Sequence, residues 1–215
     1  SELLPRASKT KRVQHHPALP YKQVNAFVTA LRKQRGSAPL ALEFMILTAG
    51  RTGEVTGAKW GEIDFGAKVW TIPSPRMKAN REHRVPLCDR AVEILNSIKT
   101  PRNPDEFIFP GWKNATGLSN GAMLALMKKM KYGQYTAHGF RSTFRDWAAE
   151  EAHGFQNETV ELALAHIIKS HAERAYRRGD QLDRRRELMN EWRRYVEVDQ
   201  STIKGKVVKI KRRAA

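Results

Sequence analysis

The segment from Ala38 to Ala49 constrains the fold more than any other part of this sequence, because it is apolar almost all round. A helix without a polar face needs other elements around it, so this segment predicts a helix buried in the centre of a domain. The segment leads directly to Gly50 and Arg51. A charged side chain is therefore expected at the edge of the core.

Composition limits the class of protein. The chain has 215 residues, 40% of them hydrophobic, which is enough to bury a sizeable core in a single domain with tails. Its 39 Lys and Arg against 22 Asp and Glu give a net charge of +17, which favours a polyanion such as nucleic acid, although ribosomal and membrane-surface proteins share this excess. A single cysteine, Cys88, excludes an internal disulfide framework. No apolar run approaches the roughly 20 residues that cross a bilayer, and we expect a cytosolic or nuclear protein without a membrane partner.

The ends of the chain differ from its middle. Residues 1–19 lack a sustained apolar period and are expected to be a linker or the stub of a longer protein. Residues 20–198 are expected to form the domain, and residues 199–215 a basic flexible tail. Ser201 to Ala215 contains several Lys and Arg and no acidic residue, which suits either an arm that touches phosphates or a solvated tail.

Periodicity predicts an α+β fold that is mainly α. Helices are expected over Tyr21–Leu31, Ala38–Ala49, Asp89–Ile98, Ser119–Met130 and Ser170–Gly179, and three more are expected to carry the apolar residues of Phe140–Ala148 (with His138 on the same helix), Val160–His166 and Leu188–Val196. Short β-rich runs at Glu62–Phe65, Val69–Pro73 and Arg84–Cys88 predict a small three-stranded antiparallel sheet. Asp89 and Ser119 are the expected N-caps of their helices, and Ser170 with Glu173 forms a capping box.

Arg51 is a candidate phosphate ligand. It stands in Ala49-Gly50-Arg51-Thr52-Gly53-Glu54, where the buried helix passes to the next element. The planar guanidinium binds two phosphate oxygens at once and stays charged at any working pH. Glu54 can orient it. A purely structural Arg51–Glu54 pair is the alternative when this segment is read by itself.

Two further segments bring cations together. His138, Arg141 and Arg145 have the spacing of one helix face, opposite the apolar stripe of the same helix. Lys78 lies in a basic turn between two expected strands, where a flexible lysine can reach a scissile phosphate and give a proton to a leaving oxygen. A solvated helix face and a solvated hairpin lysine are the alternatives for these two segments.

His166 and Tyr176 form the last candidate pair. His166 ends an apolar helix, and Tyr176 follows ten residues later among several arginines. A phenol needs nearby positive charge or a base before it attacks phosphorus, and this setting offers both. Alternatively, His166 satisfies the carbonyls of the helix end and Tyr176 anchors a surface. His166 and His171 lack a cysteine or acidic partner at ligand spacing, so no metal site is expected.

Taken together and in this order, these motifs resemble the catalytic domain of tyrosine recombinases, the phage-type integrases. The resemblance rests on Ala49–Glu54, Lys78 on a hairpin, His138-Gly139-Phe140-Arg141, Leu164-Ala165-His166 and Ala175-Tyr176, and it spans roughly residues 20–198. The segments 60–72 and 76–87 are similar to integrases of prophages and genomic islands. Ala165 stands where many members have glycine, and Phe140 where leucine is common. The amino-terminal DNA-binding domains usual in the family lie outside this chain.

The resemblance implies a mechanism and a set of site residues. Tyr176 is the implied nucleophile, giving a 3′-phosphotyrosine bond and a free 5′-hydroxyl. Arg51 and Arg141 would hold the non-bridging oxygens with a further hydrogen bond from His166. Lys78 would protonate the leaving oxygen, and His138 would be an acid–base partner that helps to take the tyrosine proton. Because guanidinium groups supply the charge stabilisation, neither a metal ion nor another cofactor is expected.

The implied partner is double-stranded DNA at attachment sites, cut and rejoined for integration or excision of a mobile element in the bacterial cytoplasm, at the nucleoid. The family works as a homotetramer on paired duplexes, with accessory DNA-bending proteins in some systems, although this part of the chain can be monomeric alone. The helix ending in Trp192, Tyr195 and Val196 is expected to dock on a neighbouring protomer or, equally, on its own domain. Two other functions share these residues: relaxation of one duplex by a type IB topoisomerase, and DNA binding without catalysis.

Overall fold

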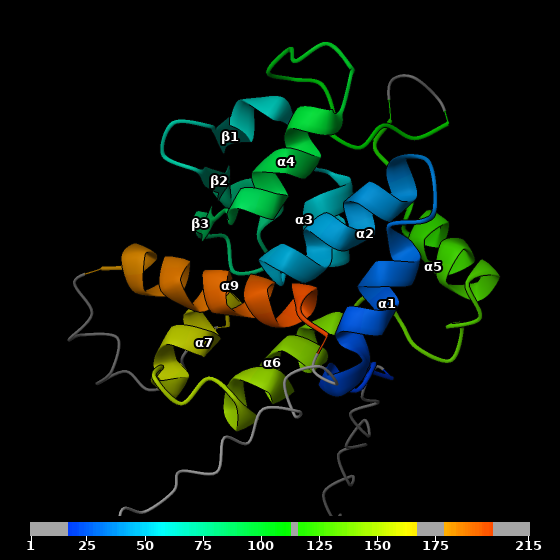
Figure 1. Ribbon diagram of the computed structural model, residues 1–215. Coiled ribbons are helices and arrows are strands. Elements are labelled where there is room, and N and C mark those ends of the chain that lie inside the picture. Colours follow the sequence, from blue (N-terminus) through cyan, green and yellow to red (C-terminus); the bar gives the residue numbers. More distant parts are fainter. Residues whose placement is uncertain (1–16, 113–115, 167–178, 200–215) are drawn as a thin grey trace, which may run out of the picture.

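The computed structural model describes residues 17–112, 116–166 and 179–199. Helices make up most of the molecule and a small sheet lies at one side of it, which confirms the α+β, mainly α fold predicted from the sequence (Figure 1). The elements are η1 Tyr21–Gln23, α1 Val24–Leu31, α2 Ser37–Thr48, α3 Thr52–Thr56, η2 Trp60–Glu62, β1 Ile63–Asp64, β2 Val69–Ile72, η3 Ser74–Arg76, β3 His83–Pro86, α4 Asp89–Ser97, α5 Asn120–Lys129, α6 Phe140–Glu150, α7 Asn157–Ala163 and α9 Leu182–Glu197. The predicted helix from Ser170 to Gly179 lies outside the described residues.

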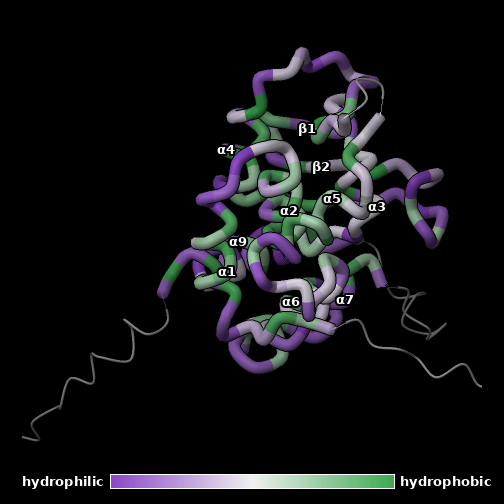
Figure 2. The backbone as a smooth tube through the Cα atoms, turned by 90° about the vertical axis from the view of Figure 1, so that its right-hand side faces the viewer, coloured by the Kyte–Doolittle hydropathy of each residue, from purple (hydrophilic) through white to green (hydrophobic). Residues whose placement is uncertain are grey.

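Helix α2 occupies the centre of the domain, as its apolar sequence predicts. It packs against α1, α3, α4, α5, α6 and α9. Hydrophobic segments accordingly run through the middle of the molecule, and hydrophilic ones lie at its periphery (Figure 2). Leu42, Phe44 and Met45 are no more than 1% exposed, and each such side chain contributes about 1.5–3 kcal/mol to folding through the removal of apolar surface from water.

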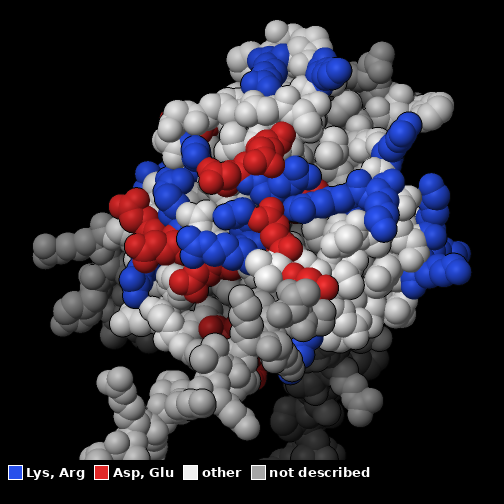
Figure 3. Space-filling model, viewed as in Figure 1, with Lys and Arg blue, Asp and Glu red and all other residues white. Residues whose placement is uncertain are grey.

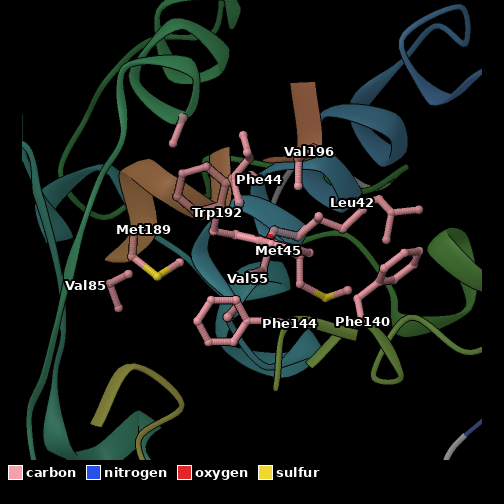
Figure 4. Packing of buried hydrophobic residues seen from close by; sticks show 14 of the residues in the cluster. Leu42, Phe44, Met45, Val55, Val85, Phe140, Phe144, Met189, Trp192 and Val196 are labelled. Carbon is pink, nitrogen blue, oxygen red and sulfur yellow. The ribbon is translucent and has the colours of Figure 1, made fainter. Parts of the chain in front are cut away.

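Helix α9 completes the core with the stripe that contains Trp192. This side chain is fully buried, packs against Phe144 and Trp147 of α6, and donates a hydrogen bond from Nε1 to the backbone oxygen of Ile46 in α2 at 2.8 Å. Figure 4 shows the side chains of α2, α6 and α9 turned toward one another. Of the two alternatives expected for this stripe, a neighbouring protomer or its own domain, the structure shows the second, because Trp192 and Val196 are covered by their own domain.

The sheet has the order β1-β2-β3 and is antiparallel throughout. Trp70 of β2 pairs with Ile63 on one side and with Val85 on the other. The predicted three strands are confirmed, but β1 is shorter than expected because Glu62 belongs to the 3-10 turn η2. Its carboxylate accepts hydrogen bonds from the backbone N–H of Lys59 at 3.3 Å and from Trp70 Nε1 at 2.9 Å, so Glu62 caps η2 and does not extend the strand.

Helix starts differ in detail from the predicted caps. Helix α4 begins at Asp89 itself, with Cys88 in the N-cap position, and the Asp89 carboxylate pairs with Lys68 Nζ at 2.7 Å and does not cap the helix. Ser119 does occupy the N-cap position of α5, but its side chain makes no capping hydrogen bond. The expected boundaries of α4 and α5 are thus right to within one residue, whereas the expected capping interactions are not observed.

Residues 17–19 belong to the folded domain and not to the expected linker. Leu19 is 1% exposed, and its backbone oxygen accepts a hydrogen bond from Thr143 Oγ1 at 2.6 Å. The backbone oxygen of Pro17 accepts a bond from the N–H of Thr136 at 3.1 Å. The predicted boundary at residue 20 is corrected by three residues, because an apolar leucine and two carbonyl groups find their partners beside α6.

Charged side chains of both signs are interleaved on the face of the molecule seen in Figure 3. The positive excess of the sequence is therefore not spread as a uniform layer over that face. Within the described ranges, none of the helices has the combination of length and apolar character that a membrane span requires.

Candidate active site

The first part of the site is the junction between α2 and α3, which fixes Arg51. Helix α2 ends at Ala49 in the left-handed conformation, with φ 49°, and Arg51 is the N-cap residue of α3. The buried carboxylate of Glu54 accepts a hydrogen bond from the backbone N–H of Arg51 at 2.8 Å and pairs with Arg51 Nη1 at 2.7 Å. The Arg51–Glu54 pair considered from the sequence is therefore real, and it orients the guanidinium as well as capping α3.

The second part is the end of α7, which places His166. The backbone N–H of Ala165 bonds to the oxygen of Leu162 at 3.0 Å, and that of His166 bonds to the oxygen of Glu161 at 3.0 Å. Together with the φ of 48° at Ala165, these two bonds form a Schellman motif that stops the helix. Ala165 is the position at which many recombinases have glycine, and its positive φ gives the physical reason, since only glycine adopts this conformation without a steric cost.

Two arginines take the carbonyl groups that the ends of these helices leave unpaired. Arg51 Nη2 donates to the backbone oxygens of Leu164 at 3.3 Å and Ala165 at 3.1 Å. Arg141 donates from Nη2 to the same oxygen of Leu164 and from Nη1 to the oxygen of Ala49. Carbonyls at a helix C-terminus carry partial negative charge, so both ends attract guanidinium groups. Arg141 thereby joins the ends of α2 and α7.

Arg141 is buried, which differs from the solvated cationic face considered for it. Helix α6 begins at Phe140, so His138 lies in the turn before the helix, and Arg141 points inward with 6% of its surface exposed. The alternative of a solvated helix face therefore does not hold for Arg141, and His138 precedes the helix on which all three residues were expected. Burial, together with the charge of Arg51, lowers the pKa of Arg141 to about 10. The guanidinium is still charged at neutral pH.

His166 joins Arg141 to Glu161, an acidic residue of α7. Its Nε2 lies 3.4 Å from Arg141 Nη2, and its Nδ1 lies 2.7 Å from Glu161 Oε2. Arg145 Nε binds the other oxygen of Glu161 at 2.7 Å. Burial raises the pKa of Glu161, but the hydrogen bonds from His166 and Arg145 outweigh it and hold this pKa below its ordinary value. Almost half of the His166 side chain is exposed, so a ligand can reach it.

His138 and Lys78 lie in two different surroundings. His138 is half-buried before α6, and its backbone oxygen accepts the N–H of Arg141 at 3.1 Å. The next residue, Gly139, lies so close to Pro17 that a Cβ there would be 2.3 Å from the Pro17 oxygen, which explains the glycine in this motif. Lys78 is exposed in the turn that follows η3, beside Met77, which is only 6% exposed.

The structure thus gathers Arg51, Arg141 and His166 around the Leu164 carbonyl and places Lys78 on the expected hairpin. Tyr176, the expected nucleophile, lies outside the described residues. Within residues 17–112, 116–166 and 179–199, no three His, Cys, Asp or Glu side chains come close enough to hold a metal ion.

Sequence reasoning missed His83, on β3. Burial is the main reason that its pKa falls to about 4, with Arg185, Arg51 and Arg141 acting in the same direction against Glu54. His83 also lines an open pocket of about 300 Å³. The other lining residues are Glu82, Arg84, Gly179 and Asp180. Its place in the basic segment after Lys78 was the available signal, but a lone histidine in a strand does not indicate a half-buried position with several arginines near it.

Comparison with known proteins gives a consistent result. Residues 17–182 match the model of the phage integrase family. The prophage integrase IntA of Escherichia coli K12 is 41% identical over 151 residues, which are 69% of this chain and 36% of that protein. The chain spans about half the length or less of the curated relatives it matches.

Solved structures agree in fold. The integrase from mycobacterium phage Brujita superposes with a TM-score of 0.60 at 22% identity, over 88% of this chain and 61% of that chain. The Tn1549 transposon integrase in complex with transposon right end DNA gives a TM-score of 0.58 at 16% identity, over 86% of this chain and 68% of that chain. At these identities the likeness shows the fold, which is that of tyrosine recombinase catalytic domains.

Proposed function

Because the chain belongs to the phage integrase family, we propose that it is the catalytic part of a site-specific DNA recombinase that serves integration and excision of a mobile element. Its relatives carry the names of phage and prophage integrases. The proposed substrate is double-stranded DNA with attachment sites, and one structural neighbour was solved in complex with transposon right end DNA. A homotetramer on two paired duplexes and action in the bacterial cytoplasm belong to the same proposal.

One observation carries this proposal, namely the double use of the Leu164 carbonyl by Arg51 and Arg141. A guanidinium has five N–H groups, and the bonds of Arg141 to Ala49, Leu164 and His166 use at most three of them. The remaining donors of two fixed arginines are available for one phosphate. Preorganised donors of this kind stabilise the negative charge that builds on the non-bridging oxygens in the transition state.

The proposed reaction makes one bond and breaks one. The phenolic oxygen of Tyr176 attacks phosphorus, the bond from phosphorus to the 5′ oxygen breaks, and a 3′-phosphotyrosine remains. Lys78 gives a proton to the departing 5′ oxygen, and His138 helps to take the proton of the phenol. His166 adds a hydrogen bond to a non-bridging oxygen. The reverse reaction, with a 5′-hydroxyl from another strand, rejoins the DNA without an external energy source.

The chain connectivity supports the nucleophile assignment. Tyr176 is three residues before Gly179, and three residues span at most about 11 Å. Gly179 and Asp180 line the same pocket as His83, whose pKa is lowered in part by Arg51 and Arg141. Asp180 is also tied to β3, since Arg84 donates to it at 2.8 and 2.9 Å. Asp180, which follows Tyr176 by four residues, is thus anchored to β3.

A nicked suicide substrate tests this proposal, because the cleaved end diffuses away and traps the intermediate. We expect a covalent protein–DNA adduct that survives SDS, and we expect Tyr176→Phe to abolish it. A Tyr176→Phe protein that still forms the adduct would overturn the nucleophile assignment, and a wild-type protein without any adduct would favour DNA binding alone. Two attachment-site duplexes then distinguish strand exchange from the relaxation of a single duplex by a topoisomerase-like activity.

A further inference from the structure

Arg76 stands at the base of the hairpin that carries Lys78, and its guanidinium is held on two sides. Nη1 pairs with Glu62 Oε1, and Nη2 donates to the backbone oxygen of Glu54. The pair is largely removed from solvent, with 22% of the Arg76 side chain and 9% of the Glu62 side chain exposed. An ion pair that is this much removed from water is less mobile than one on the surface, where a typical ion pair contributes little to the free energy of folding.

The acceptor on the sheet side is itself immobilised. Glu62 Oε2 accepts hydrogen bonds from Trp70 Nε1 at 2.9 Å and from the backbone N–H of Lys59 at 3.3 Å. Trp70 is fully buried in β2 and packs on Phe44 of α2. Both oxygens of the Glu62 carboxylate therefore accept hydrogen bonds. Arg76 is thus paired with a side chain whose rotamer is fixed by its contacts with the core.

The acceptor on the other side belongs to the arginine site. Glu54 uses its carboxylate to hold Arg51 and its backbone oxygen to hold Arg76. A hydrogen-bonded chain thus runs from the Arg51 guanidinium through Glu54 to Arg76. Met77, the next residue, is 6% exposed in the core, and Lys78 follows it. Only two peptide units separate the fastened Arg76 from Lys78.

Gly57 makes room for this arrangement. A Cβ at this position would lie 3.0 Å from Arg76 Nη2 and 3.2 Å from the backbone oxygen of Gly53. The φ of Gly57 is −98°, which any residue adopts, so a side chain here would be crowded against Arg76 but would not strain the backbone conformation. The absence of a side chain at Gly57 therefore leaves space for the Arg76 guanidinium next to α3.

We infer that Arg76 is a positioning residue that sets the distance of Lys78 from Arg51. The inference rests on the proposed function, in which Arg51 holds the non-bridging oxygens and Lys78 protonates the 5′ oxygen of the same phosphate. Lys78 is exposed, and its turn is closed by the bond from the Asn80 N–H to the Met77 oxygen at 2.9 Å. General acid catalysis depends on accurate placement of the acid. The connection through Arg76 and Glu54 holds the backbone at Lys78 in a fixed position relative to Arg51, and hence its ammonium within reach of the phosphate that Arg51 binds.

A pair of DNA substrates separates this role from a merely structural one. In the first, the scissile 5′ atom is oxygen, which needs a proton to leave. In the second, a 5′-bridging sulfur replaces that oxygen, and it leaves as a thiolate without any proton. Removal of the acid or of its support slows only the first reaction. Lys78→Ala gives the reference ratio of the two cleavage rates.

We expect Arg76→Ala to slow adduct formation about tenfold or more on the oxygen substrate and to stay within about threefold of wild type on the sulfur substrate. Gly57→Ala should shift the ratio in the same direction by displacing the guanidinium. Glu62→Gln is the milder variant if Arg76→Ala folds poorly, because glutamine has the size and shape of glutamate but lacks the negative charge that pairs with Arg76.

Arg90→Ala is the matched control. Arg90 is also a partly buried arginine, 27% exposed and paired with a buried glutamate, Glu43, but it belongs to α4. Any loss in this variant should be equal on the two substrates. Equal losses on both substrates for Arg76→Ala and Glu62→Gln, or unchanged rates on both, would overturn the inference. An adduct formed by Tyr176→Phe on either substrate would instead overturn the proposed function.

Discussion

Arg51 and Arg141 donate hydrogen bonds to one and the same backbone oxygen, that of Leu164. Two like charges are held together there because the C-terminal end of α7 presents a carbonyl that its own helix does not use. A phosphate placed against both guanidinium groups would relieve their mutual repulsion. The fold itself therefore holds the two guanidinium groups together, without the help of a bound anion.

Replacement of Arg141 by lysine should separate charge from geometry. A lysine ammonium cannot reach both the Ala49 and the Leu164 oxygens while facing a phosphate, so one end of the cross-link is lost. We expect adduct formation to fall about a hundredfold or more, in line with the loss of a preorganised donor. Single-turnover cleavage of the suicide substrate measures this effect. An Arg141→Lys protein within threefold of wild type would contradict the bridging role.

Ala165→Gly should stabilise the domain. Ala165 has φ 48°, a conformation that costs an L-residue roughly 1–2 kcal/mol, and glycine removes that cost while adding some unfolded-state entropy. We expect a net gain of about 0.5–1 kcal/mol in the free energy of unfolding, measured in urea. Ala163→Gly is the matched control, since Ala163 is the last residue of α7 with ordinary helical geometry, and this change should destabilise by about 1 kcal/mol. A loss of stability for Ala165→Gly would refute the strain argument.

His83 should make stability depend on pH in a defined direction. Its folded pKa of about 4 is below the unfolded value of 6.5, so the unfolded chain binds the proton first, and stability is full above pH 6.5 and falls as the pH drops toward 4. We expect this group to remove about 2 kcal/mol between pH 7 and pH 5. Urea unfolding of wild type and His83→Gln at both values measures the difference. Identical pH dependence in the two proteins would show that His83 is not buried in its neutral form.

Gly139→Ala should be costly because of space and not conformation. The added Cβ would meet the Pro17 oxygen at 2.3 Å and the Ala18 Cα at 3.0 Å, so residues 17–19 would have to move away from α6. We expect a loss of about 1–3 kcal/mol, as for other overpacked positions. Gly154→Ala is the control, because its Cβ would meet nothing within 4 Å. Thermal unfolding of the two variants side by side gives the comparison, and equal melting temperatures would disprove the close approach.

Much of the fold follows from local pattern. The apolar run of α2, the stripes of α1 and α6 and the β-rich segments before Cys88 each indicated the right element, since periodicity reports which face is buried. Details of capping did not follow, as the Asp89–Lys68 pair illustrates. A carboxylate next to a helix start has several possible partners, and the choice depends on a lysine 21 residues away.

The sequence alone determined the order of Arg51, Lys78, His138, Arg141 and His166 along the chain, the burial of α2 and the family that these motifs resemble. Tertiary structure decided that Arg141 is buried, that α9 is covered by its own domain, and that Arg51 and Arg141 meet at Leu164. These relations join residues up to 146 positions apart, as in the hydrogen bond from Trp192 to Ile46. Local spacing determines which residues share a face of one helix. Whether those residues reach an unpaired carbonyl group at the end of another helix depends on how all the helices pack together.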